Sequence, residues 1–280
     1  MLRVRTMEAT GRGGTKRMWL SVIALSSIVP AAAQAFRERA GRDAVFWATL
    51  AAAVAGPLAW IVVHNASAWQ TGLASTLWVT IAASFALFAV VAVRFTQAWR
   101  LVPLLAGYML LLGLGAVVWQ DVPGEPLQAT AGERGWVTVH IVLGVATYGL
   151  VTIAAVAAFA AFQQERAVKR KQPSALTRHL PSIADCERLQ LTLLQAGWSV
   201  LGVGLLTGMA LQWEESRQWL PLSHKVVLTL TAFAVIGLLL AAQRWAGVRG
   251  RRAARFVLLG YLLLTLGYPG VKFVSDVLIG

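Results

Sequence analysis

The sequence predicts an all-α protein, a polytopic membrane helical bundle with about eight transmembrane helices. Three observations predict this fold. Hydrophobic residues make up 58% of the 280 residues and charged residues only 13%, whereas a soluble domain carries about 25% charged residues. The mean hydropathy is +0.65, and the apolar residues come in long runs. The sequence also lacks the alternating ten-residue segments that are typical of a membrane barrel.

Each long apolar run is one expected span, because a helix crosses a bilayer with roughly 20 apolar residues. We expect spans near residues 18–36, 44–64, 73–94, 101–119, 136–162, 193–213, 221–243 and 254–275. Together they form a single membrane domain over residues 18–280. Gly and Ala are frequent in these runs, which favours close contact between helices.

The one long connection between spans is expected over residues 164–192, as a cytoplasmic loop. Its basic run "QQERAVKRKQ" continues the fifth helix and is suited to contact anionic lipid headgroups. Pro173 and Pro181 then interrupt the chain. The following "SIADCERLQLTLL" has Ser182 and Asp185 at the spacing of a helix N-cap, which predicts a solvated helix on the membrane surface.

Basic residues gather in alternate connections. The first, third, fifth and seventh connections contain Arg37, Arg39, Arg42, Arg94, Arg100, Arg166, Lys169, Arg170, Lys171, Arg178, Arg188, Arg244, Arg249, Arg251, Arg252 and Arg255. The second, fourth and sixth contain Arg134, Arg217 and Lys225 as their only Lys or Arg residues, beside Asp121, Glu125, Glu133, Glu214 and Glu215. Because Lys and Arg are retained in cytoplasmic loops, we expect a multi-pass bacterial inner (plasma) membrane protein with basic loops in the cytoplasm and both termini extracytoplasmic.

The first seventeen residues form a basic tail that conflicts with an extracytoplasmic N-terminus. One interpretation is a signal peptide, because "KRMWLSVIALSSIVPAAAQAF" ends in an Ala-Gln-Ala cleavage pattern. Cleavage there would leave Arg37, Arg39 and Arg42 outside and invert every later loop. We therefore favour a true start of translation at Met18, which leaves residues 1–17 upstream of the protein.

Several functional classes are disfavoured by composition. The net charge of +13 comes from short clusters between apolar runs, so it reflects membrane orientation and not nucleic-acid binding. The single cysteine, Cys186, excludes a disulfide framework and a CxxCH haem-attachment site. The spans contain almost no Asp or Glu, which disfavours a cation-coupled transporter. A closed zinc site requires four N or S ligands, which the histidines on one face do not supply.

Three of the four histidines fall on the expected extracytoplasmic face. His64 ends the second span, His140 lies one turn inside the fifth, and His224 opens the seventh; His179 is in the cytoplasmic loop. Helices of a bundle build a pocket from side chains on several of them. Imidazole is a common ligand of haem iron, which needs only one or two axial ligands. Packing or hydration of these rings is the simpler alternative.

Aromatic and cationic residues accompany these histidines. The same region contains Trp60, Trp69, Trp78, Trp119, Trp136, Trp213 and Trp219, which are suited to stack on a flat apolar cofactor or to form an ordinary interfacial belt. Arg134, Lys225 and Lys272 lie near this face and are able to pair with haem propionates. Their alternative role is that of cations that extend to the membrane interface.

The second half of the chain resembles a known family. "VTVHIVLGVATYGLVTIAAVAAF" is similar to the helix of cytochrome c assembly membrane proteins (the CcsA/CcmC-type haem-handling family) that carries a haem-ligating His and a Tyr eight residues later, here His140 and Tyr148. "LLQAGWSVLGVGLLTGMALQW", "HKVVLTLTAFAVIGLLL" and "GVRGRRAARFVLLGYLLLTLGYPGVKF" resemble the helices that follow in that family. The resemblance covers about residues 135–280 well, fits the YpjD/HemX-like branch best, and places His64 where that branch also has a His.

Two features of the haem-delivering members are missing. Their Trp-rich WGxxWxWD segment corresponds here to the short "EESRQWLPLSHK", with Trp219 alone, and no His follows the last span. The resemblance therefore implies a haem-handling scaffold in cytochrome c assembly and not a complete synthetase. It implies haem b held non-covalently near the extracytoplasmic face, with His140 as axial ligand and His64 as the second candidate for the iron. His224 is expected to substitute for His64 or to guard the entrance.

We expect no enzymatic reaction, because the chain has no recognisable nucleophile–base pair. The expected partners are membrane lipids, haem and other cytochrome c maturation components, and no nucleic acid. One alternative is a structural or regulatory membrane subunit that has lost haem binding, which the short outer loops favour. A small-solute transporter is the weaker alternative.

Overall fold

The computed structural model describes residues 17–37, 41–66, 72–122, 134–172, 175–216, 223–248 and 250–279. The expected basic tail lies outside these ranges except for Arg17, and so do Arg39, Trp69, Trp219 and the side chain of Arg134. Within the described ranges the chain is helical almost throughout and has no strand. Eight helices there are long and apolar enough to cross a membrane, which confirms the predicted all-α bundle.

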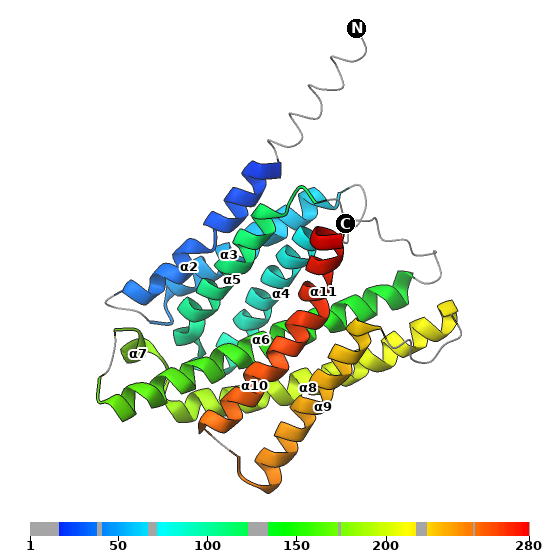
Figure 1. Cartoon of the computed structure of the whole chain (residues 1–280). Coiled ribbons are helices and arrows are strands. Elements are labelled where there is room, and N and C mark those ends of the chain that lie inside the picture. The colour runs from blue at the N-terminus through cyan, green and yellow to red at the C-terminus, as the bar shows by residue number, and fades with distance from the viewer. Residues whose placement is uncertain are drawn as a thin grey trace.

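The eight spans follow one another with short connections (Figure 1). The first, Arg17–Phe36, consists of a helix over residues 17–26, a turn, α2 (Val29–Ala33) and η1 (Gln34–Phe36). The others are built from α3 (Ala44–His64), α4 (Leu73–Arg94), η2 (Ala98–Leu101) with α5 (Val102–Val118), α6 (Arg134–Arg170), α8 (Ile183–Ser216), α9 (His224–Trp245) and α10 (Gly250–Thr265). The short α7 (Ala175–His179) links α6 to α8, and the π-helix η3 (Leu266–Gly270), α11 (Val271–Phe273) and η4 (Val274–Ile279) follow α10.

The long loop expected over residues 164–192 is shorter in the structure. Helix α6 continues to Arg170, and α8 already begins at Ile183 instead of near residue 193. The predicted N-cap is present, since the backbone N–H of Asp185 donates to Ser182 Oγ at 3.1 Å. No Pro or Gly follows in residues 183–196, so the same helix runs on into the membrane span. Cys186 and Leu189 are buried, so this segment is not a separate helix on the surface.

Helix α6 lies at the centre of the bundle, with α4, α8 and α10 packed against it (Figure 1). Its residues 147–149, 151–158, 160 and 161 are all buried, and most of them are small. Small side chains let helix backbones approach closely. The resulting van der Waals contacts stabilise helix association in lipid, where there is no hydrophobic driving force between helices. For example, a Cβ on Gly149 would come within 2.7 Å of Leu87 on α4.

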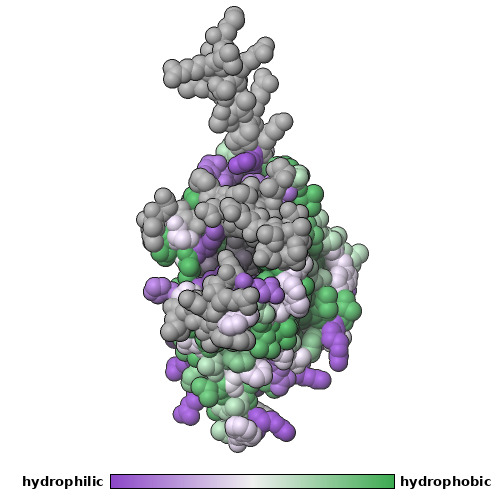
Figure 2. Space-filling view, turned by 90° about the vertical axis from the view of Figure 1, so that its right-hand side faces the viewer, coloured by the Kyte–Doolittle hydropathy of each residue, from purple (hydrophilic) through white to green (hydrophobic). Residues whose placement is uncertain are grey.

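The outer surface of the bundle is apolar. Val90, Leu111, Leu206 and Leu238 are each 66–70% exposed although they belong to four different spans. Figure 2 shows hydrophobic side chains over much of the visible face, with hydrophilic ones among them and projecting from its edges. An apolar surface of this extent fits contact with lipid acyl chains and not with water.

The connection between the first two spans is held by an ion pair. Both guanidinium nitrogens of Arg37 donate to Asp43, at 3.0 and 2.5 Å, and Asp43 also caps α3 by accepting from the backbone N–H of Phe46. These hydrogen bonds, with that of Arg37 the strongest, lower the pKa of Asp43 to about 2. The carboxylate is thus charged at any physiological pH and ties the end of the first span to the start of the second.

We expect the Gly56→Ala substitution to destabilise the protein. A Cβ on Gly56 would lie 2.0 Å from Ser27 Oγ and 3.4 Å from the Ala24 backbone, so α3 and the first span must move apart. Overpacking of this kind costs about 1–3 kcal/mol. Thermal unfolding in detergent should show a lowered Tm, whereas Gly107→Ala, whose Cβ meets nothing within 4 Å, should leave the Tm unchanged. Equal effects of the two substitutions would contradict this packing.

Candidate functional site

A cavity of about 390 Å³ lies at the end of the bundle where α6 begins and α8 ends. Its volume is within the range of about 300–1,000 Å³ that is usual for small-molecule sites. Residues of α6, α8, α9 and α10 with η3 line it. The apolar lining is Ile141, Val145, Leu201, Leu205, Met209, Val226, Leu230 and Leu264, and the polar lining is His140, Thr147, Tyr148, Gln212, Ser223, Lys225, Thr229 and Tyr268. Such a cavity suits a largely apolar ligand with a few polar groups.

One face of α6 supplies the central part of the site. His140, Gly144, Tyr148 and Thr152 are spaced by four residues, which places them above one another on that face. The first three line the cavity. Thr152 lies one turn deeper, and its hydroxyl donates to the Tyr148 carbonyl at 2.7 Å. A polar stripe therefore runs from the cavity into the interior of the bundle.

The His140 ring is held in one orientation from α8. Its Nδ1 lies 3.1 Å from Thr207 Oγ1, and the Thr207 hydroxyl donates its own hydrogen to the Gly204 carbonyl at 3.0 Å. Since that hydrogen is already used, Thr207 Oγ1 accepts from Nδ1–H of a neutral His140. His140 lines the cavity, and the lone pair of its Nε2 is not used in this hydrogen bond.

The absence of a side chain at Gly208 makes room for this ring. A Cβ at Gly208 would lie only 2.9 Å from His140 Cε1. Gly204, one turn earlier on α8, is different, because its Cβ would meet Leu143 at an ordinary 3.8 Å. Gly208, in the Gly204-Leu-Leu-Thr-Gly208 segment of α8, thus positions His140.

Three tyrosines meet below the cavity, on α5, α6 and α10. The Tyr261 hydroxyl donates to Tyr108 at 2.5 Å, and the Tyr148 hydroxyl lies 3.1 Å from Tyr261 and 3.4 Å from Tyr108. Thr265 adds a fourth hydroxyl at 3.2 Å from that of Tyr148. Hydrogen bonds within such a network strengthen one another in a low dielectric. The network joins three helices at the floor of the site.

Thr147 is the polar residue of the lining that the protein leaves unsatisfied. Its side chain is 3% exposed, and Oγ1 has no hydrogen-bond partner among the described residues. A buried hydroxyl without a partner costs about 1–3 kcal/mol. Thr147 borders the cavity, but its hydroxyl is itself buried within the protein.

Positive charge lies at the mouth of the cavity. The ammonium of Lys225 is 5.5 Å from the centroid of the Tyr268 ring, which is within the range of a cation–π contact. Lys272 on α11 is near enough for the two ammonium groups to repel each other. Two cations in this position suit a ligand that carries carboxylates.

The other predicted site residues are placed differently. His64, at the end of α3, stacks on Trp60 with ring centroids 4.3 Å apart and does not belong to the cavity lining. His224 opens α9 between Ser223 and Lys225, both of which line the cavity, but its own exposed side chain does not. His179 ends α7 in the connection between α6 and α8. The structure therefore groups His140, Tyr148 and Lys225, with Lys272 beside them, and leaves His64 and His224 outside.

Several residues of the site are missing from the predicted set. Thr207 and Gly208 orient His140. Thr147 has the buried hydroxyl without a hydrogen-bond partner, and the Tyr268 ring makes the cation–π contact with Lys225. Tyr268 lies in η3, where the helix widens around Pro269 because proline has no N–H to donate. The "GYPG" segment was a visible signal, since a proline inside an apolar span marks such a local change. Within the described segments no group of three or more His, Cys, Asp or Glu is arranged to hold a metal ion. Of the three predicted histidines, His140 is the one that lines the cavity.

Residues 44–279 match the family described as Cytochrome C assembly protein. The chain belongs to this family. A protein of Azospirillum brasilense, described as "Uncharacterized 28.8 kDa protein in nifR3-like 5'region", is 48% identical over 266 residues, which cover 93% of this chain and 97% of the relative. The "Inner membrane protein YpjD" of Escherichia coli (strain K12) is 28% identical over 182 residues, or 65% of this chain and 66% of that protein. No solved structure matches the chain.

These matches confirm the resemblance that the sequence analysis states, and they extend it. The cytochrome c assembly region covers nearly the whole chain, because its match begins at residue 44, with α3, and not near residue 135. The helices α3 to α5 thus belong to the family together with the cavity-lining helices that follow them.

We expect the tyrosine network to behave as one unit. Tyr148→Phe and Tyr261→Phe should each lower the free energy of unfolding by about 1–3 kcal/mol, because each removes a shared hydroxyl from a buried site. The double variant should lose clearly less than the sum, since the second substitution removes partners already lost. Thermal unfolding of the four proteins in detergent measures this coupling, and strictly additive losses would contradict the network.

Proposed function

We propose that this member of the cytochrome c assembly family binds haem b non-covalently in the cavity, with His140 Nε2 as an axial ligand of the iron. One observation carries the proposal: His140 lines the cavity, and its Nδ1 lies 3.1 Å from Thr207 Oγ1, whose own hydrogen is donated to the Gly204 carbonyl. In this arrangement Nδ1–H donates to Thr207 and Nε2 keeps its lone pair. Histidines that bind a metal commonly donate their other ring N–H in this way, which sets both the tautomer and the ring orientation. A neutral imidazole is the form that ligates haem iron.

The remaining lining fits the other parts of a haem. Its apolar walls suit the porphyrin ring, and the two ammonium groups of Lys225 and Lys272 suit the propionates at the mouth. Tyr148 and Gln212 add polar groups to the lining. When bound, haem supplies a redox-active iron. Covalent attachment is disfavoured, because the single cysteine, Cys186, lies near the opposite end of α8.

The proposed role is to hold or pass on haem during cytochrome c assembly, without bond-breaking chemistry of the protein's own. The charge asymmetry of the connections supports a position of the cavity at the extracytoplasmic face of a bacterial inner membrane, with both termini on that side. His64 and His224 are the candidates for a second axial ligand. Either would have to approach the cavity from its present position, and His64 would first have to leave its stack on Trp60. Other cytochrome c maturation components are the proposed partners.

We expect the purified protein to show a Soret band and α/β bands, and His140→Ala to lose most of them. The substitution removes the proposed ligand while the apolar walls remain. Visible spectra of the oxidised and reduced protein in detergent, after expression with added haem precursor, measure this. His179→Ala is the matched control, because its imidazole lies on α7 outside the cavity and should be without effect.

A wild-type protein that contains no haem and takes up none when haem is supplied would overturn the proposal. That result would favour the alternative of a structural or regulatory membrane subunit without a haem site. Haem retained in full by His140→Ala would instead show that another group ligates the iron.

We expect Gly208→Ala to weaken haem binding more than Gly204→Ala does. The added methyl group at Gly208 would displace the His140 ring from a distance of 2.9 Å and so break its hydrogen bond to Thr207. Loss of such a supporting contact typically costs about 10–100-fold in metal affinity. Gly204 also lines the cavity, but its methyl group would make an ordinary contact. Haem titration of the apo-proteins compares the two, and an equal loss would argue against the role of Gly208.

A further inference from the structure

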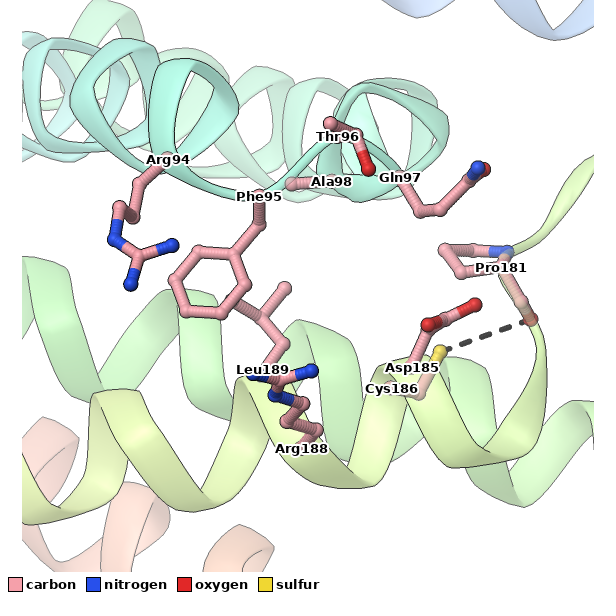
Figure 3. Close-up of a pocket in the computed structure, with 10 residues that line it drawn as sticks. All are labelled: Arg94, Phe95, Thr96, Gln97, Ala98, Pro181, Asp185, Cys186, Arg188 and Leu189. Atoms are coloured by element: carbon pink, nitrogen blue, oxygen red, sulfur yellow. Dashed lines mark hydrogen bonds between the residues drawn. The ribbon is translucent and has the colours of Figure 1, made fainter.

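A second, smaller pocket lies at the opposite end of the bundle. It has a volume of about 160 Å³ and lies between the connection that follows α4 and the first turns of α8 (Figure 3). The residues that follow Arg94 form one wall, and the segment from Pro181 to Leu189 forms the other. No part of the haem proposal uses this pocket.

The floor and the rim of this pocket differ in chemistry. Ala98, Pro181, Cys186 and Leu189 are buried and make an apolar floor. The rim is exposed and polar, with Arg94, Thr96, Gln97, Asp185 and Arg188. A ligand that fits both parts has a charged or polar group joined directly to an apolar one.

The charge of the rim is positive where the two arginines lie. Figure 3 shows Arg94 and Arg188 on the Phe95 side of the pocket and the carboxylate of Asp185 nearer to Pro181. Arg94 lies over the Phe95 ring, 5.6 Å from its centroid. The Asp185 carboxylate accepts a hydrogen bond from the Ser182 hydroxyl at 2.7 Å. Among the described residues no carboxylate forms an ion pair with Arg94 or Arg188.

The position of the pocket along the membrane normal is set by α4. Arg94 is the last residue of that span, so it marks the boundary between the acyl-chain and headgroup regions. Val90 and Val93, within one turn of it, are 66% and 61% exposed, as expected for side chains in contact with lipid. The arginine side of the pocket thus lies at the depth of lipid phosphates.

We propose that this pocket binds the headgroup phosphate of an anionic phospholipid. Guanidinium groups bind phosphate oxygens in pairs of parallel hydrogen bonds, and two of them here come from different helices. The acyl chains of the lipid run from the arginines toward the membrane interior, past the exposed Val90 and Val93. Basic pockets between membrane helices on the cytoplasmic side recognise anionic headgroups in this manner. The bound lipid bridges the end of α4 and the start of α8.

The test compares lipid binding to the full-length protein in detergent by native mass spectrometry. Phosphatidylglycerol and phosphatidylcholine with the same acyl chains are titrated, and inorganic phosphate is a third ligand. We expect phosphatidylglycerol to bind the wild type at least about tenfold more tightly than phosphatidylcholine, and the double variant Arg94→Gln/Arg188→Gln to lose at least about tenfold of that affinity. The double variant Arg170→Gln/Arg244→Gln removes the same charge from exposed positions outside the pocket and should bind as the wild type does.

Three results would overturn the proposal. An equal loss in both double variants would show diffuse attraction in place of a site. Equal binding of the two lipids would show that the anionic headgroup is not recognised. Displacement of phosphatidylglycerol by millimolar inorganic phosphate would assign the pocket to free phosphate and not to lipid. If the double variant folds poorly, Arg188→Gln alone serves, because this side chain is exposed, and the haem spectrum of each variant reports separately on the cavity at the other end.

Discussion

The close approach of α6 to its neighbours is the constraint on which the rest of the structure depends. Lipid provides no hydrophobic drive between helices, so the bundle relies on shape and on buried polar contacts. The small residues of α6 supply the shape, and a Cβ on Gly197 of α8 would come within 2.9 Å of Val151. This contact sets the separation of α6 and α8 near their middles. Toward the end where His140 lies, the helices enclose the cavity.

The same helix carries the polar groups that would be costly elsewhere in a membrane. The stripe of His140, Tyr148 and Thr152 faces the interior of the bundle, and each member has a partner from the protein. Thr147, beside this stripe, has a buried hydroxyl without a partner among the described residues. It shares this with other buried side chains, such as Trp78 and Ser84, so an unpartnered hydroxyl does not by itself mark a ligand position. The site is therefore a property of the packing of α6 and not of His140 alone.

The sequence predicts the spans because composition alone sets them. The bounds of α3 and α4 match the prediction, since charged residues and turns limit these apolar runs. The start of α8 does not, because residues 183–192 are amphipathic, and Cys186 and Leu189 become buried only when this segment packs in the bundle. The candidate site is harder to predict from the sequence than the spans are. His140 and Tyr148 share a helix and a resemblance, but the role of Thr207 depends on how α8 rotates against α6. His64 looks equivalent in sequence, yet α3 places it on Trp60.

Charge balance links the two ends of the molecule. The net charge is +13, so even if every carboxylate paired with one cation, that excess would remain without a protein partner. Pairs such as Arg37–Asp43 and Lys169–Glu165 use some of the few acidic residues. The excess positive charge must be neutralised by anions from outside the chain. The position of each cation determines which kind of anion can reach it. The anions we propose are lipid phosphates at the arginines at the end of α4 and the start of α8, and the carboxylates of haem at Lys225 and Lys272. The basic composition that first indicates membrane orientation thus also indicates two separate classes of anionic ligand.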